Sequence, residues 1–283
     1  MPIIIVLSLV LLGAALWAAW SLYRRRRREA LFHRLPRPEH VAILERNVPL
    51  YGHLPPELRR ALGGLVNVLL DEKTFVGCDG LAVTEEMRVT VAGNACLLLL
   101  GGGRLTFPGF RTILMYPDAF LTEQTSYDGM VQTREHSVRS GESWERGPVV
   151  LAWSDIEEDL QYAGDGRNVV LHEFAHKLDE ENAGTDGLPV LRDRSQYTEW
   201  RAVLSREYES LKRDAESGGE STLDPYGAES PAEFFAVATE AFFEMPGTLR
   251  VRLPALYEQL RRYYNVDPAT WMRETGGVSR AGT

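Results

Sequence analysis

The N-terminal segment constrains the chain most, because residues 3–23 hold no charged side chain and consist mainly of Ile, Leu, Val, Ala and Trp. As a helix with a rise of about 1.5 Å per residue, this segment would span roughly 30 Å, the thickness of one bilayer core. A cleavable signal peptide carries positive charge before its apolar run, whereas here five arginines, residues 24–28, follow it. The sequence therefore predicts one N-terminal transmembrane helix.

The arginine run also predicts the orientation of the chain. Basic residues beside a span stay on the cytoplasmic side, and Trp17, Trp20 and Tyr23 lie near the same end, where aromatic rings favour the headgroup level. We expect a single-pass protein of the inner (cytoplasmic) membrane whose main domain faces the cytoplasm. A buried core helix is the alternative for the apolar segment. A nucleic-acid signal is the alternative for the arginines, although directly after a span they more simply determine topology and contact anionic lipid.

The charge of the remaining chain argues against nucleic acid as a partner. The protein has 31 basic and 40 acidic residues, so 26 basic and 40 acidic residues follow the arginine run, a formal charge of −14. Such a body would repel phosphates. Cys78 and Cys96 are the only cysteines and have no CxxC spacing. We predict two reduced, buried thiols, and neither a disulfide framework nor a thiolate metal site.

Residue patterns predict an α+β fold in one main domain. An anchor with the arginine run (residues 1–28) precedes a proline-containing linker (29–56), the main domain (57–270) and a flexible tail (271–283), and we expect the linker to be irregular from residue 35 on. Short β-rich stretches, notably residues 112–116 and 149–153, predict a small mixed sheet. Helical patterns occupy residues 57–71, 84–100, 168–179, 197–216, 231–244 and 253–264. Thr84 is a candidate N-cap, and the glycines at 101–103 are a helix stop.

The segment His172-Glu-Phe-Ala-His176 carries the chemistry. Four residues turn a helix about 40° past one full turn, so both imidazoles leave the same face and can bind one tetrahedral zinc ion. Glu173, one position further round, cannot comfortably bind the same ion but can reach its bound water as a general base. The pattern predicts a zinc metallopeptidase. The alternative is a pair of polar histidines on a helix surface, with Glu173 a solvated charge.

A catalytic zinc needs a third protein ligand. No histidine follows at the close spacing of the HExxHxxGxxH type, so we expect a carboxylate from a later helix, with Glu229, Glu233 and Glu240 as candidates. Spacing favours Glu233 only weakly, because Ser230-Pro231 starts a helix in which Glu233 could instead be a capping-box partner. Glu240 lies two turns further along the same face and could orient a ligand histidine instead.

Two segments, HEFAHKLD at 172–179 and DPYGAESPAEFFAVATEAFFE at 224–244, resemble the zinc peptidase family typified by Mlc titration factor A (MtfA-like). Residues 83–100 and 147–153 are similar to other recurring blocks of that family, so the resemblance spans residues 51–264. It implies a gluzincin-like group with a zincin-like α+β domain, in which an HExxH helix carries the active site.

The resemblance also implies roles for single residues. One zinc ion would be held by His172, His176 and Glu233, with Glu173 as the base. Tyr226 would donate a hydrogen bond to the oxyanion, and its alternative role is to pack a turn. Asp179 would either orient a histidine or close the helix.

The function that the resemblance implies is hydrolysis of peptide or protein substrates, with a leaning toward aminopeptidase activity. The best-known members are soluble and bind a sugar-responsive transcriptional repressor, whereas this chain carries an expected anchor. A second hypothesis is therefore a membrane-anchored regulatory protein that binds and sequesters a partner, such as a transcriptional regulator, with minor peptidase activity. A purely structural membrane protein is a third hypothesis, and an absence of bound metal would favour it.

Overall fold

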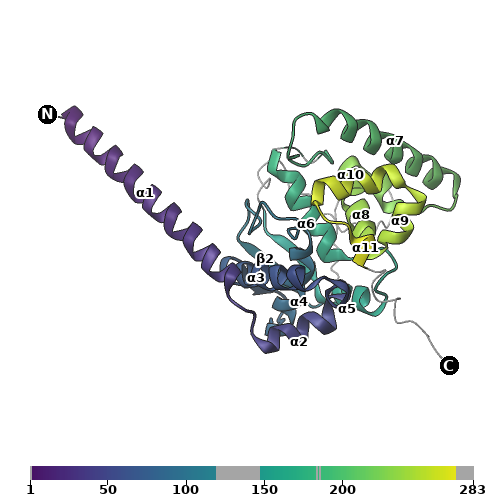
Figure 1. Ribbon diagram of the computed structural model, residues 1–283, viewed down its shortest axis with the longest axis horizontal. Coiled ribbons are helices and arrows are strands. Elements are labelled where there is room, and N and C mark those ends of the chain that lie inside the picture. Colours follow the sequence, from purple (N-terminus) through teal and green to yellow (C-terminus); the bar gives the residue numbers. More distant parts are fainter. Residues whose placement is uncertain (1, 119–146, 183, 185, 272–283) are drawn as a thin grey trace, which may run out of the picture.

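One long helix, α1 (Pro2–His33), projects away from a body formed by the rest of the chain (Figure 1). The computed structural model describes residues 2–118, 147–182, 184 and 186–271. Within these residues α1 is the one helix long and apolar enough to cross a membrane; its stretch Val6–His33 has a mean hydropathy of 1.8, and its apolar part is not buried in the body. The expected N-terminal apolar helix is therefore present, and it continues unbroken through the arginine run.

The base of α1 packs against α3 (Pro56–Glu72). Arg24 and Arg28 both donate to one oxygen of Glu72, at 3.1 and 2.6 Å. Further along, the two backbones come so close that a Cβ added at Gly64 would lie 2.1 Å from the carbonyl oxygen of Phe32. Only a residue without a side chain fits this approach. The end of α1 is thus part of the packed body.

The segment expected to be an irregular linker forms two helices instead. These are α2 (Pro38–Asn47) and a 3₁₀ helix, η1 (Pro49–His53). Pro38 and Pro49 stand in the first turns, where a missing N–H costs no intrahelical hydrogen bond. Leu44 and Leu54 are buried in the core. The expectation of irregular structure from residue 35 is wrong, because these prolines begin helices; the division of the chain into domains stays a prediction.

The sheet has three strands in the order β1-β2-β3: β1 (Thr74–Gly77), β2 (Thr112–Tyr116) and β3 (Val149–Ala152). Both predicted strands are confirmed, except that Trp153 begins α5 (Trp153–Gln161). The expected mixed sheet differs: all strands that the structure describes are parallel, with Thr74 opposite Thr112 and Ile113 opposite Val149. Long connections allow this, since β1 and β2 are joined through a helix. The expected β-rich stretches at 119–146 lie outside the described residues.

All six predicted helices are confirmed. They are α3, α4 (Glu85–Leu97), α6 (Val169–Asp179), α7 (Gln196–Ser217), α8 (Pro231–Glu244) and α10 (Pro254–Tyr264). The hydroxyl of Thr84 accepts from the N–H of Met87 at 3.2 Å, which confirms the N-cap. Further short elements, besides α5, were not expected: η2 (Glu180–Asn182), η3 (Pro225–Ala228), α9 (Pro246–Arg252) and α11 (Pro268–Trp271).

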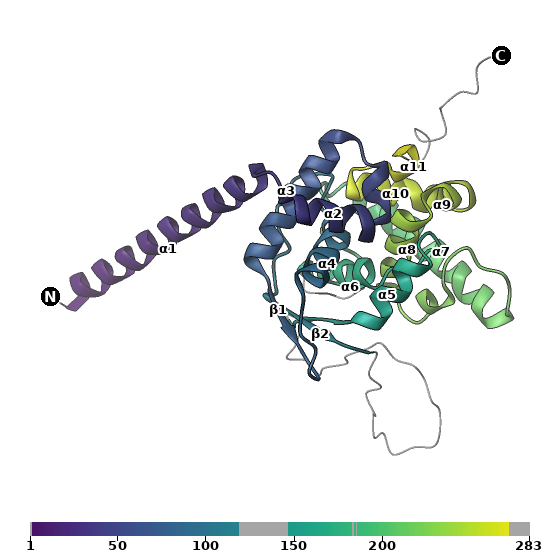
Figure 2. The same ribbon diagram turned by 90° about the horizontal axis from the view of Figure 1, so that it is seen from below.

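The centre of the body is the pair α6 and α8, which lie against each other with α4 alongside α6 (Figures 1 and 2). Phe174 of α6 meets the ring of Phe107 edge-on at 4.8 Å between centroids. Helix α8 is buried on nearly every side. Cys96 belongs to this core, Cys78 is half-buried, and both thiols are free. Because α8 is interior, each of its carboxylates needs a partner, and these partners lie on α6 and in the segment just before it.

Candidate metal centre

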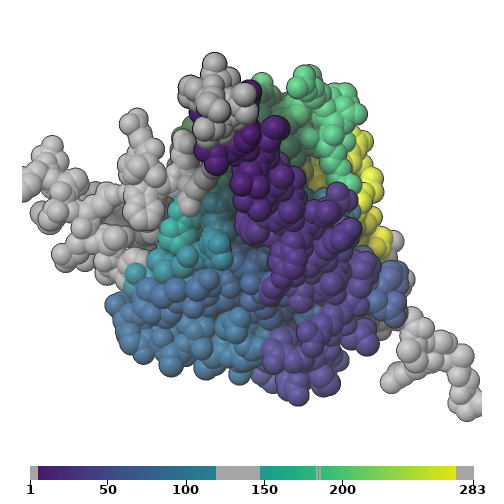
Figure 3. Space-filling view, turned by 90° about the vertical axis from the view of Figure 1, so that its left-hand side faces the viewer, coloured from purple at the N-terminus to yellow at the C-terminus, as the bar shows by residue number. Residues whose placement is uncertain are grey.

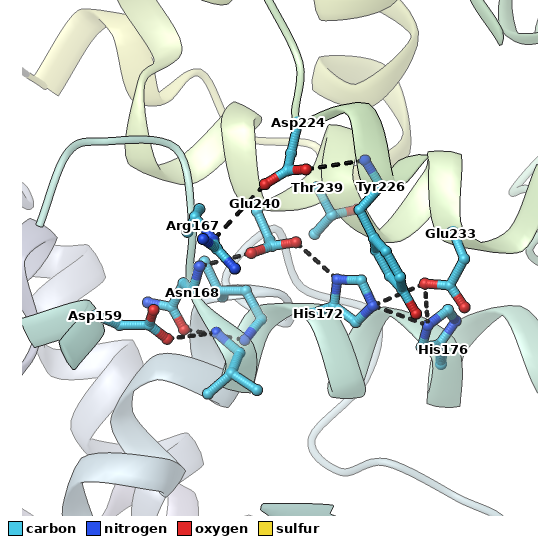
Figure 4. Close-up of polar contacts among 12 residues, drawn as sticks. Asp159, Arg167, Asn168, His172, His176, Asp224, Tyr226, Glu233, Thr239 and Glu240 are labelled. Atoms are coloured by element: carbon cyan, nitrogen blue, oxygen red, sulfur yellow. Dashed lines mark hydrogen bonds and ion pairs between the residues drawn. The ribbon is translucent and has the colours of Figure 1, made fainter. Parts of the chain in front are cut away.

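Side chains from three elements fix the first turn of α6 (Figure 4). The backbone N–H of Asn168 donates to Glu240 of α8 at 2.6 Å, and that of Val169 donates to Asp159 of α5 at 2.6 Å. The side-chain oxygen of Asn168 caps the helix by accepting from Leu171 at 3.1 Å. Helix N-termini leave their first N–H groups without intrahelical partners, and here three of them are bound by side chains. The histidines one turn later are therefore held in a defined position.

Two imidazoles and one carboxylate converge between α6 and α8. The Nε2 atoms of His172 and His176 are 3.1 Å apart, and an oxygen of Glu233 lies 2.9 Å from the first and 3.3 Å from the second. All three side chains are mostly buried, with exposed fractions of 13%, 18% and 20%. Ser230 accepts from the backbone N–H of Glu233 at 3.2 Å, while the carboxylate of Glu233 faces the histidines.

The other ring nitrogen of His172 contacts a second carboxylate. Nδ1 lies 2.7 Å from Glu240, and we assign the proton to Nδ1 because Glu240 can only accept while ionised. Nε2, the other ring nitrogen, faces His176 and Glu233 and is the atom that would bind a metal ion once it carries no proton. Glu240 and Glu233, two turns apart on one face of α8, therefore lie on opposite sides of the same imidazole (Figure 4).

Electrostatics shows what this arrangement favours. Burial disfavours a charge on His172, but the carboxylates of Glu240 and Glu233 outweigh it and raise the pKa of His172 well above its ordinary value. Burial likewise disfavours the charge of Glu233, but the two histidines hold its pKa well below the ordinary range. The space between these carboxylates thus stabilises positive charge, which a metal cation also supplies.

The donor set fits a single metal ion. His172, His176 and Glu233 each offer one ligand atom, all within 4.8 Å of one another. Ligands at about 2 Å around a tetrahedral zinc ion are about 3.3 Å apart. The separations of 2.9, 3.1 and 3.3 Å are close to that edge length. Three such ligands leave a fourth position for water or substrate, as catalytic sites require.

The predicted base and oxyanion donor lie beside this group. Glu173 is half-buried, and its carboxylate makes no hydrogen bond to the residues that the structure describes. The ring of Tyr226, on η3, lies 5.9 Å from that of His172 between centroids, and its side chain extends toward Glu233 (Figure 4). The sequence separates these residues by about fifty positions, and the packing of η3 and α8 on α6 brings them together.

Two further candidates lie elsewhere. Glu229 is exposed at the end of η3, outside the cluster of metal-ligating atoms. Asp179, at the end of α6, is buried and accepts from the N–H of Gly187 at 2.9 Å; its other oxygen has no hydrogen-bond partner among the described residues. Burial raises the pKa of Asp179 to about 6. Asp179 therefore fastens the chain that follows α6 and forms no hydrogen bond with a histidine.

Asn168, Asp159 and Glu244 support the site without having been predicted. The amide of Asn168 donates to Glu244 at 2.9 Å, and burial raises the pKa of Asp159 to about 7. The sequence of α8 could have indicated Glu240 and Glu244 as functional residues, because carboxylates four residues apart are unusual in a helix this apolar. No such pattern indicated Asp159, since it ends an ordinary acidic stretch of α5.

Comparisons with known proteins agree with this chemistry. The model of the family described as "Glucose-regulated metallo-peptidase M90" matches residues 21–265. An uncharacterized protein of Synechocystis sp. is 40% identical over 276 residues, which cover 95% of this chain and 98% of that protein. Proteins named Mlc titration factor A from Yersinia pestis and Yersinia pseudotuberculosis are 35% identical over 227 residues, which cover 78% of this chain and 83% of each.

Proposed function

Because this chain belongs to the glucose-regulated metallo-peptidase M90 family, together with Mlc titration factor A, we propose that it is a zinc-dependent peptidase. The observation that carries the proposal is the convergence of His172 Nε2, His176 Nε2 and one oxygen of Glu233 within 3.3 Å. Glu240 behind His172 adds the carboxylate that metal-binding histidines usually have as a partner. In this proposal α6 is the HExxH helix of a zincin-like domain.

Two imidazoles and one carboxylate are a ligand set that is typical of catalytic zinc sites. Bound between His172, His176 and Glu233, zinc would polarise the scissile carbonyl and acidify water. The chain's own residues would do the rest. Glu173, which pairs with none of the described residues, accepts the proton of the attacking water and returns it to the leaving amine. Tyr226 extends toward the same point and donates a hydrogen bond to the carbonyl oxygen as negative charge develops there.

The substrate is proposed to be a peptide or protein, cleaved in an aminopeptidase-like manner, as the family resemblance implies. Hydrolysis of fluorogenic peptides by the purified full-length protein tests both the peptidase activity and the preference for free N-termini. We expect turnover that a chelator abolishes and added zinc restores, with free N-termini cleaved faster than acetylated ones. Equal rates on the two peptide forms would remove the aminopeptidase proposal and keep the peptidase. Turnover that is indifferent to chelation would contradict the metal mechanism.

A second candidate function follows from the relatives. The Yersinia relatives are named Mlc titration factor A, and the family resemblance implies binding of a transcriptional repressor. A membrane-anchored regulator that sequesters a protein partner, such as a transcriptional regulator, is therefore the alternative for this chain. It differs from the first proposal in one measurable respect, because sequestration needs no general base. A Glu173→Gln variant that keeps its cellular effect would favour it.

Helix α1 supports an anchor for either function. We propose that it crosses the cytoplasmic membrane once, and that the arginines after the apolar run hold the catalytic domain on the cytoplasmic side. Labelling of single engineered cysteines from each side of intact cells tests this orientation. Accessibility of the body from outside the cell would overturn it.

Glu240→Gln is expected to weaken metal binding by about 10- to 100-fold, the usual cost of losing the partner behind a ligand histidine. The amide keeps the size of the side chain but lacks the charge that fixes the proton on Nδ1 of His172. Competition with a coloured chelator measures the affinity. Glu244→Gln is the matched control, because Glu244 is buried on the same helix and contacts Asn168 and Gly164 instead. Equal losses in both variants would indicate a general effect on helix packing.

A further inference from the structure

A cavity of about 700 Å³ lies at the base of α1, away from the metal centre. Its lining includes Arg24 and Arg28 from α1, Lys73 after α3, and Arg111 before β2. Among the described residues that line it, Glu72 is the one acidic residue. Figure 3 looks onto the face of the body from which α1 projects, where these segments lie beside the base of the helix. Four cationic side chains from three separate segments therefore share one cavity.

The single carboxylate does not neutralise this cavity. Glu72 accepts from Arg24 at 3.1 Å, from Arg28 at 2.6 Å and from the hydroxyl of Thr106 at 2.6 Å. Burial disfavours its charge, but Arg28 and Thr106 outweigh this and lower the pKa of Glu72, which is therefore ionised at neutral pH. One negative charge against four basic groups gives the described residues of the lining a formal charge of +3. The carboxylate orders the two arginines and leaves an excess of positive charge.

Lys73 and Arg111 add positive charge, and neither forms an ion pair with a carboxylate among the described residues. The ammonium of Lys73 is buried and donates to the carbonyl oxygens of Phe107 and Phe110, at 2.5 and 2.8 Å. Burial lowers the pKa of Lys73 to about 8, so it stays mostly protonated near pH 7. Arg111 is exposed, and within the described part of the chain its guanidinium forms no ion pair. Arg111 is thus free to bind an anion.

The position of the cavity relative to the bilayer follows from where the apolar part of α1 ends. Arg24 comes directly after the apolar residues 3–23, and Arg28 lies about 6 Å further along the helix. If residues 3–23 fill the hydrocarbon core, both guanidinium groups lie in the headgroup layer, which is roughly 5–8 Å thick on each side. Phosphates of membrane lipids occupy that layer. The cavity and the headgroups are therefore at the same level.

We propose that this cavity binds the phosphate-bearing headgroup of an anionic membrane lipid, with Arg24, Arg28 and Arg111 as its direct contacts. Guanidinium groups suit phosphate because their paired N–H donors match its oxygens. Lys73 fixes the segment 107–110 that forms one wall and adds long-range attraction. The site rests on insertion of α1 in the bilayer and does not depend on the peptidase function.

The test uses the full-length protein in nanodiscs that contain equal amounts of phosphatidylglycerol and phosphatidylcholine. Native mass spectrometry counts the lipids that stay bound when the disc is removed. We expect retained phosphatidylglycerol in preference to phosphatidylcholine. Arg111→Gln should reduce that preference about fivefold, the value expected for one basic residue near lipid phosphate. Arg111 is exposed and lies outside the arginine run, so the variant should fold and insert normally.

Arg201→Gln is the matched control, because Arg201 is an exposed arginine on α7 that does not line the cavity. Equal retention in Arg111→Gln, Arg201→Gln and the unmodified protein would overturn the proposal. So would displacement of phosphatidylglycerol by millimolar inorganic phosphate, with the same dependence on Arg111, since the ligand would then be a soluble phosphate. Failure to enter the nanodisc would also overturn it, without affecting the metal centre.

Discussion

Replacement of Glu173 by glutamine is expected to reduce peptide hydrolysis by about 10²- to 10⁴-fold, the usual contribution of a general base. The amide has the size of the carboxylate but cannot accept a proton from water. Glu173 makes no hydrogen bond to the described residues, so its loss should leave α6 and the metal ligands in place. Steady-state kinetics on fluorogenic peptides, with metal content by elemental analysis of the same samples, measures both effects.

The control is Glu180→Gln. Glu180 follows α6 directly and is half-buried like Glu173, but its carboxylate pairs with Lys177 at 2.9 Å and contacts no ligand. We expect this variant to keep the rate of the unmodified protein within a few-fold. If Glu173→Gln retained that rate as well, Glu173 would not be the base. If it lost hydrolysis but kept binding of a cellular partner, the two candidate functions would be separated.

Glu233→Ala is expected to lower metal affinity by more than about 100-fold, because it removes a ligand rather than the partner behind one. The substitution keeps the backbone N–H that Ser230 caps, so α8 should still begin at Pro231. Elemental analysis of the full-length protein after dialysis measures the loss, and circular dichroism verifies the helices. We expect one zinc ion per chain in the unmodified protein and almost none in the variant.

Glu229→Ala is the matched control for this experiment. Glu229 lies four positions before Glu233, but its side chain is exposed and outside the group formed with His172 and His176. It should keep its metal. Zinc retained in Glu233→Ala and lost in Glu229→Ala would reverse the assignment of the third ligand. An absence of metal from all three proteins would favour the protein-binding function.

Long periodic segments of the fold were predictable from the sequence, and short elements were not. Helices such as α7 and α8 bury one face or all faces over several turns, which leaves a clear pattern. Strand β1 has only four residues, most of them exposed, and its partner β2 begins 38 positions later. Strand β1 forms because it pairs in parallel with distant residues, and the local sequence pattern does not predict such pairing.

The candidate site shows the same limit. Spacing alone predicts that His172 and His176 share one face of a helix, because helix geometry is local. Spacing cannot distinguish Glu233 from Glu240, since both lie on one face of α8. What separates them is which nitrogen of His172 each contacts, Nε2 or Nδ1. Which nitrogen each carboxylate contacts depends on how α8 packs against α6, and this is a property of the tertiary structure. The sequence pattern could not choose Glu233 as the ligand, and the resemblance to a family made that choice.

The unbroken course of α1 into the packed body has a consequence for substrate choice. A catalytic domain on a loose tether samples many heights above a bilayer. Here α1 continues to His33, and its last turns contact α3 so closely that Gly64 has no room for a side chain. With α1 in the membrane, the centre at His172 stays at nearly constant height and tilt. If α1 spans the membrane and the chain is a peptidase, as proposed, substrates would be selected by how far their cleavable segment reaches from the lipid surface.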